Sequence, residues 1–265
     1  KNNKVLISGR VNQMGERTLQ CSLSLPNSTH IDSITSFYFF DTTDSVLLTS
    51  AFSSLPYDFL IKSTGNPRIH KSTALKIPFE IKEKFKNRLL LRTLRLNCVN
   101  IHFRELWKSL WTPDFEKDSW SIERPLLKSL SPVESKWNVT IPLRTYFERR
   151  LALIEIDVLV SMSIGLTIEE LILIYKIQFP VLYQNEEDTW YDQRGNIVFT
   201  CSKGLTGVGV DRPIWDSIKD LKDGETYDHT IEKSELYYGE KVTYYAPFEK
   251  CDRVEDYKVA WAHFE

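Results

Sequence analysis

The sequence lacks the features that would assign a chain to a membrane, secreted or redox class. It has no run of 18 apolar residues, so we expect no helix that spans a membrane. Its four cysteines lie no closer than fifty residues apart, which excludes a CxxC redox pair or a zinc knuckle and predicts reduced thiols in the cytoplasm. It begins with neither Met nor a secretory signal, as expected of a fragment of a longer chain.

Motifs for catalysis are missing as well. The chain contains no Walker loop, no HExxH helix and no GxSxG elbow. No Pro-Pro pair occurs, so the chain lacks the Asn-Pro-Pro-aromatic segment with which an adenine-modifying methylase holds the amine of its base. The five histidines are scattered, which argues against a metal cluster: they are His30, His70, His102, His229 and His263. We therefore expect no catalytic residue, no metal and no cofactor in this part of the protein.

A glycine-rich stretch, "SKGLTGVGVDR" at Ser202–Arg212, follows the strand-like run 196–200. Its glycines have the order GxxGxG, which differs from the GxGxxG order of a dinucleotide-binding loop. The next helical stretch, 214–221, is short and polar, whereas a phosphate cradle leads into a longer helix. We predict a structural turn. The reason for three glycines stays open at this point, because close approach of DNA or of another domain would each require them.

A magnesium-dependent nuclease is an alternative on the residues alone. Such an enzyme binds Mg²⁺ with two carboxylates and places a lysine beside the attacking water. Asp58, Glu80 and Lys82 occur in the required order, and Asp220-Leu221-Lys222 repeats the second half of the motif. Triplets of this kind arise by chance in any charged chain, so the order alone does not establish a site.

The hydrophobic pattern predicts an α+β fold. Strands are expected before residue 40, then a helix over Ser45–Lys62 that Pro56 kinks or divides, and a mostly helical region over Lys82–Trp111. Residues 112–139 are rich in turn signals. After them we expect a helix that ends at Gly165 and a second helix that begins with a capping box of Thr167 and Glu170 and stops at Pro180. Strands are then expected on both sides of the turn 192–195 and at 227–231 and 241–245. A last helix is expected over 253–264.

Charge is distributed unevenly along the chain. The segment Asp58–Lys108 carries 12 Lys and Arg against 4 Asp and Glu, so its net charge is +8, while the rest of the chain carries −10. A basic middle in an acidic chain favours one face that meets a polyanion, and a pair of solvated Lys-rich helices is the alternative. The cations fall in a polar loop, Ser63–Thr73, and in a row at helical spacing that is expected to share one face: Lys84, Arg88, Arg92 and Arg95.

From about residue 47 onward the sequence resembles the C-terminal half of long restriction–modification adenine-specific DNA methyltransferases of type IIG and related phage-defence systems. The resemblance is carried by "LLTSAFSSLPYDFLIKSTGNPRIHKSTALKIPF", "LLLRTLRLNC", "FRELW" and "IPLRTYFERRLALIEIDVLVSMSIGLTIEELILIYKIQFPVL", and by "WYDQRGNIVFTCSKGLTGVG" and "APFEKCDRVEDYKVAWAHFE". The family's catalytic segment and its donor-binding motif have no counterpart in the chain.

The resemblance implies that this chain recognises a double-stranded DNA target for an upstream methyltransferase domain that binds S-adenosylmethionine. It also implies a recognition domain over 1–112, a linker over 113–141 and a C-terminal helical hairpin with a small α+β region over 142–265. The expected DNA contacts are Lys62, Arg68, His70, Lys71, Lys84, Arg88, Arg92 and Arg95. A protein-interaction module that docks on a helicase or nuclease subunit is a further alternative, for which the acidic half offers Tyr237, Tyr238, Tyr244, Tyr245 and Trp261.

Overall fold

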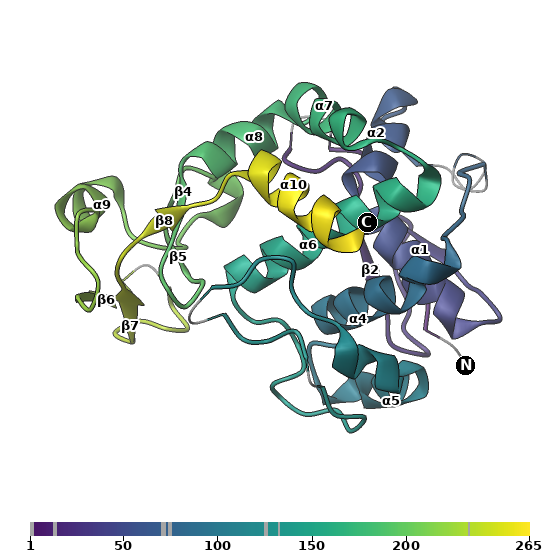
Figure 1. The fold of residues 1–265 in the computed structure, drawn as a ribbon, viewed down its shortest axis with the longest axis horizontal. Coiled ribbons are helices and arrows are strands. Elements are labelled where there is room, and N and C mark those ends of the chain that lie inside the picture. Colours follow the sequence, from purple (N-terminus) through teal and green to yellow (C-terminus); the bar gives the residue numbers. More distant parts are fainter. Residues whose placement is uncertain are drawn as a thin grey trace.

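The computed structural model describes residues 3–12, 15–69, 73, 76–124, 127–131, 133–232 and 234–265. Helices and short antiparallel strands make up the chain, which confirms the predicted α+β fold (Figure 1). Among the described residues, no helix is both long and apolar enough to cross a lipid bilayer.

The chain opens with a small sheet covered by a helix. Strand β1 (Val5–Ser8) lies between β2 (Cys21–Leu23) and β3 (Ile34–Phe37) and is antiparallel to both. Alternation along β1 buries Val5 and Ile7, and helix α1 packs on this sheet. The prediction of strands before residue 40 is confirmed.

The predicted helical region Ser45–Lys62 consists of two helices, α1 (Thr42–Ser53) and α2 (Leu55–Ser63), which is one of the two outcomes expected from Pro56. Pro56 lies in the first turn of α2, where a backbone N–H would have no hydrogen-bond partner within the helix. The missing N–H of proline therefore costs nothing there, and Pro56 begins a second helix.

The basic region that follows α2 contains η1 (Glu83–Phe85), α4 (Lys86–Asn97), η2 (Ile101–Phe103) and α5 (Arg104–Leu110). Its mostly helical character is confirmed.

The predicted linker, 113–141, begins with η3 (Pro113–Lys117) and packs into the core of the molecule. Phe115, Trp120 and Trp137 are buried, and the indole N–H of Trp137 donates to the carbonyl of Cys98 at 2.9 Å. The same cluster of buried side chains runs from Val5 to Phe264. The described residues between 113 and 141 therefore contribute side chains to this main core, which would not be expected of an exposed linker.

The centre of the molecule is α6 (Tyr146–Ile164), which packs against α1, α4, α7 and the last helix α10 (Arg253–Phe264). Figure 1 shows α10 lying across α6. Gly165 ends α6 with a left-handed φ of 82°, and Thr167 with Glu170 forms the capping box of α7 (Ile168–Gln178), as predicted. Pro180 then begins α8 (Pro180–Glu187).

Several ionised side chains are enclosed where α6, α8 and α10 meet. Arg253 pairs with Asp157 at 3.1 Å and with Glu186 at 2.7 Å, and Arg150 pairs with Glu186 at 2.8 Å and with Asp256 at 2.5 Å. Burial would raise the pKa of Glu186, but Arg150 and Arg253 lower it to about 2. These contacts join helices that are distant in the sequence.

A smaller lobe, residues 189–250, lies at one end of the molecule (Figure 1, left). It holds the sheet β5-β4-β8, made of β4 (Thr189–Tyr191), β5 (Ile197–Thr200) and β8 (Glu249–Lys250), and a hairpin of β6 (Thr226–Thr230) and β7 (Lys241–Tyr245). Helices η4 (Lys203–Leu205) and α9 (Arg212–Ile218) complete it. A second apolar cluster fills this lobe, in which the Trp215 ring stacks on Phe199 with centroids 5.6 Å apart.

Candidate nucleic-acid interface

Arg92, one of the expected DNA contacts, is fully buried. Its Nε lies 2.5 Å from Oε2 of Glu155 on α6, and its Nη1 lies 2.5 Å from Oδ2 of Asp118. Burial would lower the pKa of Arg92, but Glu155 and Asp118 raise it, so the guanidinium stays charged. The Arg92 side chain joins α4 to α6 and to the segment after η3.

Arg95 is buried as well, and its recorded hydrogen bonds to the described residues all go to backbone carbonyl oxygens. Its Nε donates to the carbonyl of Ile141 at 2.7 Å and its Nη1 to the carbonyl of Leu130 at 2.7 Å. Burial lowers the pKa of Arg95 to about 10. The predicted basic row on one exposed face is therefore wrong, because α4 packs against both α1 and α6 and turns these two positions inward.

The other two members of the row lie on aromatic rings. Lys84 is exposed, with Nζ 4.7 Å from the centroid of Phe85. Arg88 is half-buried, with its guanidinium 5.1 Å from the ring centroid of Phe264. Lys84 thus keeps its charged end in solvent, whereas the guanidinium of Arg88 packs on a ring of α10.

Lys62 has a structural contact at a helix end. Its Nζ donates to the carbonyl of Gln178 and lies 5.0 Å from the centroid of the Phe179 ring. A cation at the C-terminal end of α7 is favoured by the carbonyls left unpaired there. This contact joins α2 to α7 and accounts for Lys62 without a ligand.

Arg68 is exposed and lies beside a residue that the sequence did not single out. An isolated antiparallel bridge pairs Arg68 with Arg10, and it is closed by Ile69 N donating to Gly9 O at 3.0 Å and Val11 N donating to Pro67 O at 3.1 Å. Both arginines are exposed. Neither side chain makes a hydrogen bond or ion pair with any residue that the structure describes. His70 and Lys71 lie outside the described residues.

The bridge sets two arginine positions directly opposite each other. Hydrogen bonds flank Arg10 and Arg68 without joining them directly, and in such a pair the side chains share one face with Cβ atoms about 4.5–5.5 Å apart. Like charges opposite each other destabilise a strand pair. No local pattern predicts this juxtaposition, because Arg10 follows the first strand and its partner lies in a loop after α2.

Asp58, the first carboxylate of the alternative nuclease site, is a buried structural group. Its two oxygens accept from Arg17 Nε at 2.7 Å and from the backbone N–H groups of Thr18 and Leu19 at 3.1 and 2.9 Å. A carboxylate with these partners is not available to Mg²⁺. Within the described ranges, no group of three or more His, Cys, Asp or Glu side chains is placed to hold a metal ion.

The glycine-rich stretch packs on the strand before it. A Cβ on Gly209 would lie 2.4 Å from the carbonyl oxygen of Val198, and Gly209 has a φ of 74°. Gly207 also has a left-handed φ, of 84°. The Oγ of Ser202 donates to Glu16 at 2.6 Å, which ties the turn to the N-terminal part of the chain. Close approach to the chain's own β5 therefore explains Gly209, and this supports the predicted structural turn.

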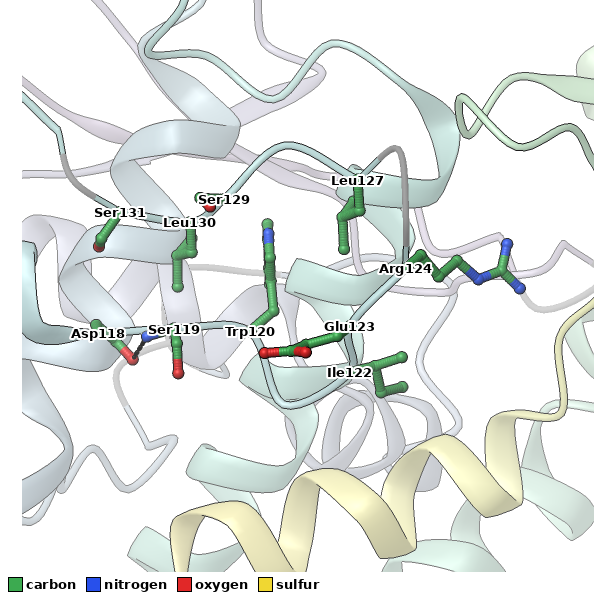
Figure 2. A pocket seen from close by; sticks show the side chains of 10 residues that line it. All are labelled: Asp118, Ser119, Trp120, Ile122, Glu123, Arg124, Leu127, Ser129, Leu130 and Ser131. Atoms are coloured by element: carbon green, nitrogen blue, oxygen red, sulfur yellow. Dashed lines mark hydrogen bonds between the residues drawn. The ribbon is translucent and has the colours of Figure 1, made fainter. Parts of the chain in front are cut away.

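Residues from 118–124 and 127–131 line a hollow of about 210 Å³ (Figure 2). The ring of Trp120 stands in its middle, and Arg124 points away from it. Asp118, on its edge, is already paired with Arg92. We assign no DNA contact to this hollow, because Arg124 is turned toward Glu249, 3.1 Å away, and the Phe147 ring.

The four cysteines are free, as predicted. Burial raises the pKa of Cys98 to about 12 and that of Cys21 to about 11. A thiol with such a pKa is almost entirely protonated near neutral pH, so neither residue is an activated nucleophile.

The aromatic residues of the alternative docking surface are dispersed. Tyr237 and Tyr238 are exposed near the tip of the β6–β7 hairpin, whereas Tyr244 is buried. Tyr245 lies under Arg194, whose guanidinium is 3.6 Å from its ring centroid, and Trp261 is half-buried on α10. Only the two hairpin residues are open to a partner, and the docking function stays a prediction.

Comparison of the chain with protein-family models, with curated protein sequences and with solved structures found no match. The resemblance to restriction–modification methyltransferases therefore stays a prediction from the quoted segments.

Proposed function

We propose that this chain is the DNA target-recognition region of a cytoplasmic restriction–modification adenine-specific DNA methyltransferase. Catalysis and S-adenosylmethionine binding would belong to an upstream domain of the parent protein, and this region would hold the duplex in register. The proposal is supported by the resemblance of the quoted segments and by one feature of the structure, the Arg10–Arg68 bridge.

The bridge carries the proposal because its geometry suits a phosphate. Two adjacent guanidinium groups repel each other until an anion lies between them, and a DNA phosphate supplies that anion with acceptors for both. Protein–DNA hydrogen bonds go mostly to phosphate and sugar, and such contacts set the register of the protein on the duplex. Of the eight residues expected to contact DNA, Arg68 and Lys84 are the described ones that remain exposed.

The test measures binding of a labelled mixed-sequence DNA duplex by fluorescence anisotropy across a salt series. We expect affinity to fall steeply with salt, and each of Arg10→Ala and Arg68→Ala to reduce the slope of log Kobs against log salt by about 1. Arg104→Ala is the matched control, since Arg104 is also exposed but lies on α5 beside Glu105.

Two results would contradict the proposal. Absence of binding at low salt would show that this chain does not recognise DNA. An equal loss in Arg104→Ala and Arg68→Ala would show an effect of net charge that does not involve the bridge.

A further inference from the structure

Helix α7 carries apolar side chains on its outer side. Leu171 and Tyr175 are buried against the rest of the molecule, whereas Leu173 is 57% exposed and Ile177 is 60% exposed. A helix at the surface usually places charged and polar residues opposite its buried stripe, but α7 places a leucine and an isoleucine there. Figure 1 shows α7 at the outer edge of the molecule. The sequence of α7 therefore suits a helix that is covered on both sides.

The exposed residues of α7 form one continuous face. Positions 169, 173, 176 and 177 are all exposed, and they follow the i, i+4, i+7, i+8 spacing of a single helix face. Leu173 and Ile177 are one turn apart, so their side chains are neighbours. The 11 residues of α7 give this face a length of about 16 Å, which is enough for a helix–helix contact.

Two opposite charges lie along one edge of this face. Glu169 and Lys176 are exposed and are seven residues apart, so they point in nearly the same direction, two turns from each other, with Leu173 between them. Glu170 is already used within the helix, because its carboxylate accepts from the backbone N–H of Thr167 at 2.8 Å in the capping box. Along α7 the edge is therefore acidic, then apolar, then basic.

This order of charges is complementary to its own reverse. When a second copy of α7 packs antiparallel across a two-fold axis near Leu173, Glu169 of each copy faces Lys176 of the other, and the two Leu173 side chains meet on the axis. The symmetry forms both ion pairs at once. A parallel pair would place each charge opposite its own kind, which is repulsive. Charge complementarity thus favours a second copy of this chain, in the antiparallel orientation.

We propose that the chain forms a two-fold homodimer through the outer face of α7, with Leu173 on the axis, Ile177 beside it and a Glu169–Lys176 pair at each end. One helix from each copy buries less than the roughly 800 Å² per partner of a standard interface, so we expect a weak dimer with a Kd of about 10–100 µM. The dimer does not depend on DNA binding by the Arg10–Arg68 bridge, and either proposal can fail alone.

Sedimentation equilibrium over a concentration range of about 5–500 µM measures the dimer. We expect Leu173→Glu, which places two carboxylates on the axis, to weaken dimerisation by roughly thirtyfold or more. Leu236→Glu is the matched control, because Leu236 is a leucine 77% exposed between β6 and β7, away from α7, and its replacement should leave the Kd unchanged. Circular dichroism of each variant verifies that the fold is retained.

A charge exchange tests the antiparallel orientation. Glu169→Lys and Lys176→Glu should each weaken the dimer roughly tenfold, because each change places like charges together at both ends of the interface. The variant that carries both changes has opposite charges facing each other again, and its Kd should return to within about threefold of the original value.

Three results would overturn the proposal. A monomer over the whole concentration range would assign the apolar face of α7 to a different protein partner. Equal dimerisation of Leu173→Glu and Leu236→Glu would place the contact elsewhere on the molecule. A double charge variant that dimerises as poorly as the single variants would exclude the antiparallel pairing of Glu169 with Lys176.

Discussion

The main core and the small lobe use charge in opposite ways. In the main core, Arg92 and Arg253 are buried against carboxylates from other parts of the chain. In the lobe, an aromatic cluster around Trp215 makes the interior, and acidic residues such as Glu235 and Glu240 stay exposed. Arg92, one of the cations that form a row at helical spacing in the sequence, thus holds the fold together, whereas acidic side chains of the lobe such as Glu235 and Glu240 lie at the surface.

The largest effect is expected from Arg92→Met, which leaves Glu155 and Asp118 buried without their cation. We expect a loss of about 3–5 kcal/mol of unfolding free energy, measured by urea denaturation. Arg68→Met is the matched control, and its exposed side chain should change stability by less than about 0.5 kcal/mol. Similar losses in the two variants would contradict the contrast between buried and exposed arginines.

Acid should weaken the main core through Glu186. Because its pKa in the fold is about 2, below an ordinary value near 4.5, its stabilisation is complete above pH 4.5 and is lost progressively as the pH falls to about 2. The loss amounts to roughly 3 kcal/mol. Burial raises the pKa of Asp157, so protonation of Asp157 changes the stability in the opposite direction to protonation of Glu186. The Glu186→Gln variant keeps Asp157, so a comparison of the two proteins isolates the contribution of Glu186. The stability gap between the two proteins should close on acidification, and a gap independent of pH would refute this account.

In the lobe, Gly209→Ala should be the most damaging small change. The added Cβ would meet the carbonyl oxygen of Val198 at 2.4 Å in a left-handed backbone, so we expect a loss of about 2 kcal/mol. Gly204→Ala is the control, because its Cβ would lie 3.7 Å from the Ser202 hydroxyl. Hydrogen exchange of β5 reports the effect locally. Equal protection in the two variants would mean that the close approach is not required.

The smallest effect is expected from removing the acidic groups of the lobe. Glu235→Gln and Glu240→Gln should each change the free energy of unfolding by less than about 0.5 kcal/mol, because neither side chain has a recorded partner among the described residues. A clear loss in thermal denaturation would show that these carboxylates serve the fold.

Local signals were sufficient for most elements of the fold. Gly165, the Thr167–Glu170 capping box and Pro56 each act within one turn of chain, and the structure has all three where the sequence places them. The glycine order in 202–212 likewise excluded a dinucleotide loop, and the contact of Gly209 with Val198 supplies the reason for one glycine.

The candidate sites were less predictable, because their partners are distant in the sequence. Arg92 and Arg95 share helical spacing with Lys84, yet only the packing of α4 on α1 and α6 decides which of them meets water. Asp58 is held by Arg17, 41 residues earlier. Arg10 gains significance only through its bridge to Arg68. Pairings of this kind depend on tertiary contacts that no local pattern contains.

The position of Arg253 constrains the order in which this chain can fold during synthesis. Asp157 is fully buried on α6, and the cation that faces it lies 96 residues further along the chain. Until α10 has emerged from the ribosome, closing the core would bury Asp157 without its Arg253 partner, and removing one partner of a buried ion pair costs several kcal/mol. The native partner of Asp157 can therefore be in place only after the segment that carries Arg253 has been synthesised.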